Sequence, residues 1–185
     1  MPLSATEVER ELRHTRRVRY EGYKRADGLW DIEAHLTDIK NHDYDLKTGV
    51  RRAGQPVHSM WIRVTVDRRM NVVAAAASSD AVPYPGGCET IVPAYGKLVG
   101  LNLVQGFRQK AGELLGGVRG CTHLTEMLAG LPTAAIQTFA GEMRGEDGDG
   151  AKPFQLDQCH ALETTTETVK KWYPKWYKGR EEASR

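Results

Sequence analysis

The chain has 185 residues, a length that fits one domain with a full hydrophobic core better than two. Its 26 basic and 24 acidic side chains leave a formal net charge of only +2, so we expect neither nucleic acid nor a membrane as a partner. No stretch approaches the roughly 18 apolar residues of a membrane helix, and the first residues lack the apolar core of a signal peptide. We therefore expect a cytoplasmic protein.

The first part of the chain has the pattern of a β-hairpin. Residues 29–39 alternate between apolar and polar side chains, which is typical of a half-buried strand. The β-rich segment 16–25 precedes them and is joined to them through Ala26, Asp27 and Gly28. Asp-Gly between two strand patterns is a strong hairpin signal, so these two segments are predicted to pair in antiparallel fashion.

Two further strands are predicted after a long polar loop. Residues 58–67 place Met60, Ile62, Val64 and Val66 on one face, with His58 at the edge of that face. Residues 72–80 follow a short turn and complete the strand pattern. The prolines and glycines of residues 81–87 then end the sheet.

The next part of the chain is predicted to be helical. Thr122 is expected to cap the third helix, which should be interrupted or kinked near Pro132. Pro93 is tolerable only in the first turn of the first helix. The three helical segments are residues 89–100, 102–117 and 121–143.

Strands followed by helices predict an α+β fold, with an antiparallel sheet of about four strands followed by three helices packed on one face. We place this domain at residues 16–143, after an N-terminal extension over residues 1–15. Residues 144–185 are expected to form a charged linker and a basic, aromatic C-terminal tail. Trp172 and Trp176 of this tail are expected to pack on the domain, on a second copy of the chain or on a partner protein.

Four potential metal ligands lie at the ends of the expected elements: His58, Cys88, Cys121 and His123. Three cysteines in a reducing compartment favour free thiols over disulfides, and the start of a helix favours the thiolate of Cys121. If these ends meet at one edge, the four side chains would bind one zinc or iron ion per chain. The alternative is that the cysteines are small core residues and that His123 lies on the surface.

The order of these residues resembles the NifU-type iron-sulfur cluster scaffold proteins. The resemblance rests on Pro56-Val57-His58, on Gly87-Cys88 and on Gly120-Cys121. It implies a NifU-scaffold-like fold and a site for zinc or a nascent cluster. His58 stands where the family has its first cysteine, and Ser59-Met60 stands where the family has Gly-Asp, so a mononuclear ion is favoured over a labile cluster.

A closer resemblance covers most of residues 18–140 and is to bacterial domain-of-unknown-function family 2889. It is carried by residues 20–38, 54–67, 83–103 and 120–124. This resemblance implies the domain boundaries and a bacterial cytoplasmic setting, and it adds no chemistry.

Carboxylates near the expected ligands supply candidates for catalysis. Glu89 and Glu126 are close in sequence to Cys88 and His123, where a metal-assisted general base would be needed, although both are equally typical of a first helical turn. Glu33 and His35, with Asp38 near the end of their strand, form a second candidate set, although such rows are more often solvated sheet faces.

The function that this pattern favours is a metal-dependent enzyme of the lyase or hydrolase type that acts on a small organic substrate. The alternatives are a carrier or scaffold for a metal or an iron-sulfur cluster, and a purely structural metal site. Four protein ligands would favour a structural site, whereas three ligands and a water would favour an enzyme.

Overall fold

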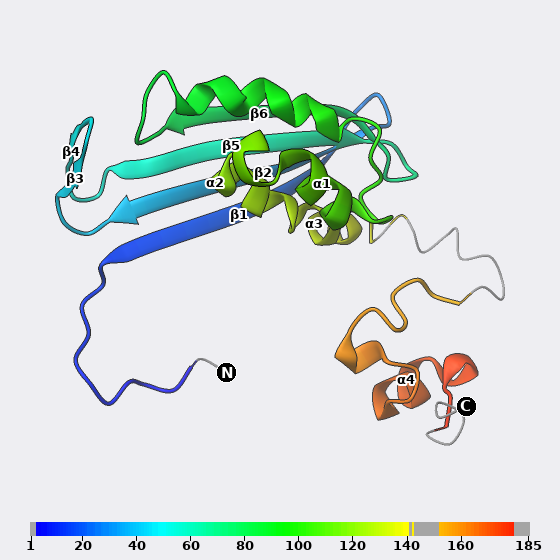
Figure 1. Cartoon of the computed structure of the whole chain (residues 1–185). Helices are drawn as coiled ribbons and strands as arrows, with labels where there is room; N and C mark the ends of the chain where they lie inside the picture. The colour runs from blue at the N-terminus through cyan, green and yellow to red at the C-terminus, as the bar shows by residue number, and fades with distance from the viewer. Residues whose placement is uncertain (1–2, 141, 143–151, 180–185) are drawn as a thin grey trace. The chain divides into compact units, whose positions relative to one another are not determined.

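The computed structural model describes residues 3–140, 142 and 152–179 (Figure 1). The chain divides into two compact units, Met1–Thr138 and Phe139–Arg185. The predicted domain boundaries stay a prediction, and the linker expected from residue 144 lies largely outside the described residues.

The first unit is built on a four-stranded antiparallel sheet in the order β1-β2-β5-β6. This arrangement confirms the predicted α+β class and the antiparallel sheet. Gly28, with φ of +83°, allows the tight turn between the first two strands, where the N–H of Arg25 donates to the carbonyl of Leu29. The strands are β1 (His14–Lys24), β2 (Trp30–Lys40), β5 (Pro56–Val66) and β6 (Val72–Ala81).

The polar loop expected between the second and third predicted strands contains a small hairpin of its own. Its strands are β3 (Tyr44–Leu46) and β4 (Gly49–Arg51). The Arg51 side chain donates to the carbonyl of Val82, which ties this hairpin to the end of β6. Strands of three residues carry too little alternation to be recognised from sequence.

Helices cover one face of the sheet (Figure 1). The first predicted helix forms as a 3₁₀ helix. Pro93 lies in its interior and has no N–H to donate to an α-helical hydrogen bond. The third predicted helix is divided into two at Gly130, and Cys121, not Thr122, occupies the N-cap position without a side-chain capping bond. The helical elements are η1 (Cys88–Leu98), α1 (Phe107–Leu115), η2 (Gly117–Arg119), α2 (Thr122–Leu128) and α3 (Leu131–Phe139).

The core lies between the helices and the inward face of the sheet. Alternation in β2 and in residues 60–64 of β5 buries every second side chain, and the helices contribute the opposing layer. Its largest fully buried side chains are Ile32, Leu36, Met60, Ile62, Tyr95, Leu98, Leu103, Phe107, Leu115, Leu124, Met127 and Leu131.

The second unit has a small core of its own around Leu156 and Val169, which are both buried. Trp172 is 67% exposed, so packing of this side chain on a partner stays a prediction. Its elements are η4 (His160–Leu162), α4 (Glu167–Trp172) and η5 (Pro174–Trp176). Within the described part of the chain, every helix is too short or too polar to cross a membrane.

Candidate metal centre

Polar side chains form a row across three strands on the helix-covered face of the sheet. In the strand register, Asp38 of β2 lies opposite Arg16 of β1 on one side and opposite His58 of β5 on the other. Because side chains alternate along a strand, Asp38 points the same way as Leu36, and His58 points the same way as Met60. Asp38 is therefore a carboxylate on the core-facing stripe, and it is only 4% exposed.

The buried carboxylate of Asp38 has partners on both oxygens. Arg16 donates from Nε to Oδ1 and from Nη2 to Oδ2, both at 2.8 Å. His14 Nε2 lies 2.7 Å from Oδ1, and His58 Nδ1 lies 3.0 Å from Oδ2. Burial alone would raise the pKa of Asp38, but the hydrogen bonds from Arg16 and His14 outweigh it and hold this pKa at about 2. The carboxylate is thus ionised at neutral pH.

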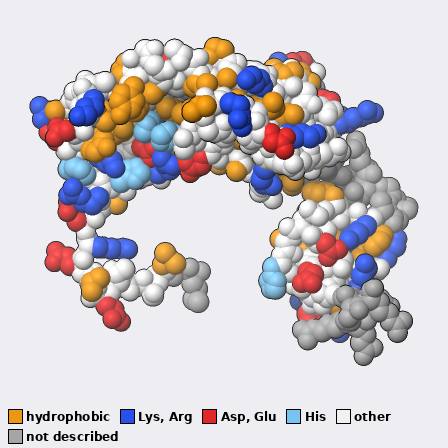
Figure 2. Space-filling model, in the orientation of Figure 1, with side chains coloured by type: hydrophobic (Ala, Val, Ile, Leu, Met, Phe, Trp, Pro, Cys, Tyr) orange, Lys and Arg blue, Asp and Glu red, His pale blue; other side chains and the backbone are white. Residues whose placement is uncertain are grey.

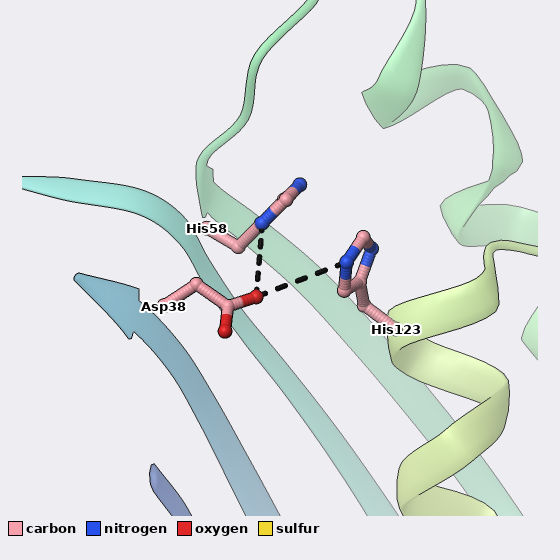
Figure 3. Close-up of side chains that lie close together, drawn as sticks. All are labelled: Asp38, His58 and His123. Atoms are coloured by element: carbon pink, nitrogen blue, oxygen red, sulfur yellow. Dashed lines mark hydrogen bonds and ion pairs between the residues drawn. The ribbon is translucent and has the colours of Figure 1, made fainter. Parts of the chain in front are cut away.

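Helix α2 brings a second imidazole to the same carboxylate. His123 Nε2 lies 3.8 Å from Asp38 Oδ2, and the rings of His58 and His123 face each other with centroids 3.8 Å apart (Figure 3). Burial lowers the pKa of His58, and the neighbouring His123 lowers it further. A neutral imidazole at His58 keeps a lone pair that can bind a cation.

The spacing of these side chains fits one metal ion. One ligand atom from each of Asp38, His58 and His123 lies within 4.8 Å of the other two. A tetrahedral ion with bonds of about 2.0 to 2.1 Å holds its ligand atoms about 3.3 Å apart. The observed separations of 3.0 and 3.8 Å from Asp38 Oδ2 lie on either side of that value. Small side-chain shifts would therefore let the three residues share an ion.

The structure brings together two of the four ligands predicted from sequence, His58 and His123. Among the residues that it describes, no group of three or more candidate ligands includes a cysteine. Cys121 Sγ lies 3.9 Å from His123 Nδ1, the ring nitrogen other than the one near Asp38. Cys88 is the half-buried first residue of η1. A ligand role for either cysteine stays a prediction.

The thiol of Cys121 is nevertheless easier to ionise than an ordinary cysteine. Its burial raises the pKa, but the hydrogen bond with His123 and the backbone N–H groups of Leu124 and His123 lower it more, so the net shift is downward. The sequence-based expectation of thiolate character at this position has physical support.

The two carboxylates predicted as bases have other partners. Glu126 Oε2 accepts a hydrogen bond of 2.6 Å from Arg16 Nη1. The guanidinium of Arg16 therefore lies between Glu126 and Asp38. Glu89 Oε2 accepts the backbone N–H of Gly86 at 2.8 Å, in the turn before η1. Their catalytic roles stay predictions.

Tyr95 holds the start of α2 in place. Its hydroxyl oxygen accepts the backbone N–H of Cys121 at 3.0 Å and lies 2.8 Å from Thr125 Oγ1 and 3.1 Å from the carbonyl of Cys121. The side chain is fully buried. This phenol therefore positions the turn of helix that carries His123.

Replacing Tyr95 with Phe should lower the free energy of unfolding by about 2 kcal/mol, because the half-buried N–H of Cys121 would lose its partner inside the protein. Urea denaturation followed by circular dichroism measures this change. Tyr84→Phe is the matched control, because Tyr84 is 55% exposed and should tolerate loss of its hydroxyl. Equal stability of the two variants would show that the Tyr95 hydroxyl does not anchor the helix.

A model of the family described as "Protein of unknown function (DUF2889)" matches residues 14–137. The chain belongs to this family. The matched segment contains the entire row of Arg16, Asp38 and His58 as well as His123, so the candidate site lies within the family's domain. No curated protein and no solved structure matches the chain. The NifU resemblance, which rested on three short motifs, is not supported.

Proposed function

We propose that this domain binds one zinc or iron ion through Asp38, His58 and His123 and uses that ion in a reaction on a small organic substrate. The observation that carries the proposal is the meeting of three candidate ligand atoms within 4.8 Å around a buried carboxylate. Imidazole nitrogens and a carboxylate oxygen are ligands that zinc and iron accept. Three protein ligands leave at least one coordination position for water or substrate, as catalytic sites require.

The surroundings of the three residues support this role. Arg16 donates to both oxygens of Asp38, which fixes the orientation of the carboxylate in the way that outer partners orient metal ligands. Arg16 and His14 occupy Oδ1, whereas Oδ2 accepts one hydrogen bond from Arg16 and keeps a second lone pair that faces the two imidazoles, so the guanidinium and an ion can share the carboxylate. His58 would bind through Nδ1 in the tautomer that carries its proton on Nε2. A bound ion would act as a Lewis acid or activate a water molecule.

A second candidate function is metal-independent acid-base chemistry by His58. It is favoured by the 3.0 Å contact between His58 Nδ1 and the buried Asp38, which orients the ring and leaves Nε2 to exchange a proton. This geometry is that of a carboxylate-imidazole pair. Metal binding decides between the two functions, because only the first one requires an ion.

The experiment is metal analysis of protein purified without chelators, followed by calorimetric titration of the metal-free protein with Zn²⁺ and, without oxygen, with Fe²⁺. We expect about one ion per chain. His58→Ala and His123→Ala should each weaken binding by at least about 100-fold, since a ligand contributes more than its outer partners do. His35→Ala should bind like the wild type, because His35 is stacked on Trp61 and bonded to Ser59 away from this cluster.

Cysteine variants distinguish the ligand set of Asp38, His58 and His123 from the set with Cys88 and Cys121 that was expected from sequence. With Asp38, His58 and His123 as ligands, Cys88→Ser and Cys121→Ser should keep the affinity within a few fold. A large loss in either variant would restore the cysteine-containing set expected from sequence. Absence of any bound ion, with His58 and His123 intact, would leave the metal-independent function.

A further inference from the structure

A small pocket of about 180 Å³ opens beside the three proposed ligands. Figure 2 shows histidine side chains gathered beside acidic and basic ones on the face in view. Since one water in the liquid takes about 30 Å³, the pocket has room for about six waters, which is space for a small organic molecule only. Besides Asp38, His58 and His123, its lining includes Arg16, Lys40 and Tyr44.

Lys40 is the cation of this pocket that is left for a ligand. It follows Asp38 by two residues on β2 and so points to the same side of the sheet. Arg16 already pairs with Asp38 and Glu126. Within the part of the chain that the structure describes, no ion pair is found for Lys40, whose Nζ lies 5.2 Å from the centre of the Tyr44 ring. This ring holds the ammonium near the pocket without neutralising it.

We propose, building on the proposed metal site, that the substrate is a small monocarboxylate whose anionic group pairs with Lys40. One uncompensated ammonium matches one negative charge, and a bound divalent ion would add further positive potential. A phosphate carries nearly two charges and favours several donors, whereas the guanidinium of Arg16 is already engaged by two carboxylates. The wall formed by Val57 and Tyr44 suits an apolar body on the acid.

The test is calorimetric titration of the zinc-loaded full chain with butyrate and benzoate, with butyramide and benzamide as neutral counterparts and with inorganic phosphate. We expect at least one acid to bind and its amide to bind at least about tenfold more weakly. Lys40→Ala should weaken binding of the acid by about tenfold or more, and Lys40→Arg should restore part of it. Lys24→Ala is the matched control, because Lys24 also lies over an aromatic ring, that of Trp30, at the far end of β1.

The outcomes separate this inference from the proposed function. Zinc titration of Lys40→Ala should give the wild-type affinity, because Lys40 is not a proposed ligand. Failure of the wild type to bind zinc overturns the proposed function and, with it, this inference. Zinc binding without discrimination between acids and amides, or without an effect of Lys40→Ala, overturns only the inference. Tighter binding of phosphate than of either acid would also overturn it.

Discussion

Replacing Asp38 with Asn is expected to destabilise the domain by about 3 kcal/mol at pH 7. The change removes the charge that pairs with Arg16 and accepts from His58, and it leaves a guanidinium without its buried partner. This loss of stability is at the lower end of the range for broken buried ion pairs, because the Arg16 side chain is 33% exposed and can be hydrated. Urea denaturation measures it. Asp45→Asn is the control, since Asp45 is exposed on β3 and should change stability by less than about 0.5 kcal/mol.

The same variant should change the response to acid. The pKa of Asp38 in the folded protein is about 2, below the ordinary 3.8, so its ionisation stabilises the fold fully above about pH 4. This stabilisation, about 2 kcal/mol for a shift of this size, is lost as the pH falls from about 4 to 2. The stability difference between wild type and Asp38→Asn should therefore shrink over that range. A difference that stays constant from pH 6 to pH 2 would contradict the assigned ion pairs.

Replacing Gly120 with Ala should cost about 3 kcal/mol, at the upper end for overpacked sites. An added Cβ would lie 2.1 Å from the carbonyl oxygen of Leu115 and 2.9 Å from Thr125 Oγ1. The backbone of Gly120 is extended, with φ of −148°, so the cause is lack of space and not a strained dihedral angle. A backbone oxygen cannot rotate away as a side chain can. The start of α2, which carries His123, would have to move, so metal affinity should fall as well.

Gly112→Ala is the matched control for that experiment. Gly112 lies inside α1 with nothing within 4 Å of the added atom, so alanine should raise stability by about 0.5 to 1 kcal/mol through its higher helix propensity. Thermal melting of both variants shows the contrast. A Gly120→Ala protein that melts like the wild type would contradict the close approach between residues 115 and 120.

Much of the sheet could be predicted because its signals are local. The alternation of residues 29–39 and the Asp27-Gly28 turn can each be recognised from about a dozen consecutive residues. The structure has the alternation in β2 and the turn between β1 and β2. The small β3–β4 hairpin and the 3₁₀ geometry of η1 could not be predicted in the same way. The hairpin strands have three residues each and are held by contacts such as the Arg51 bond to Val82, and the 3₁₀ geometry of η1 follows from Pro93 inside a pattern that otherwise looks like an α-helix.

The site could be predicted only in part because its geometry depends on strand register. His58 and His123 were recognisable from their places at the ends of elements, and the structure brings them together. Asp38 had a weaker signal: it continues the apolar stripe of β2 at the position where Ile32 and Leu36 predict burial. Asp38 pairs with Arg16, 22 residues earlier, because the register of the β1–β2 hairpin places the two residues opposite each other. The spacing of residues along the sequence does not reveal this register.

The most direct test of the central claim is X-ray absorption spectroscopy at the zinc edge of the zinc-loaded protein. Coordination by Asp38, His58 and His123 predicts a first shell of nitrogen and oxygen at about 2.0 to 2.1 Å, with the multiple scattering of imidazole rings and no sulfur. The imidazole scattering should weaken in His123→Ala, which keeps only His58 as an imidazole ligand, and should remain in Cys121→Ser. A sulfur shell near 2.3 Å would instead make a cysteine a ligand and contradict the proposed coordination.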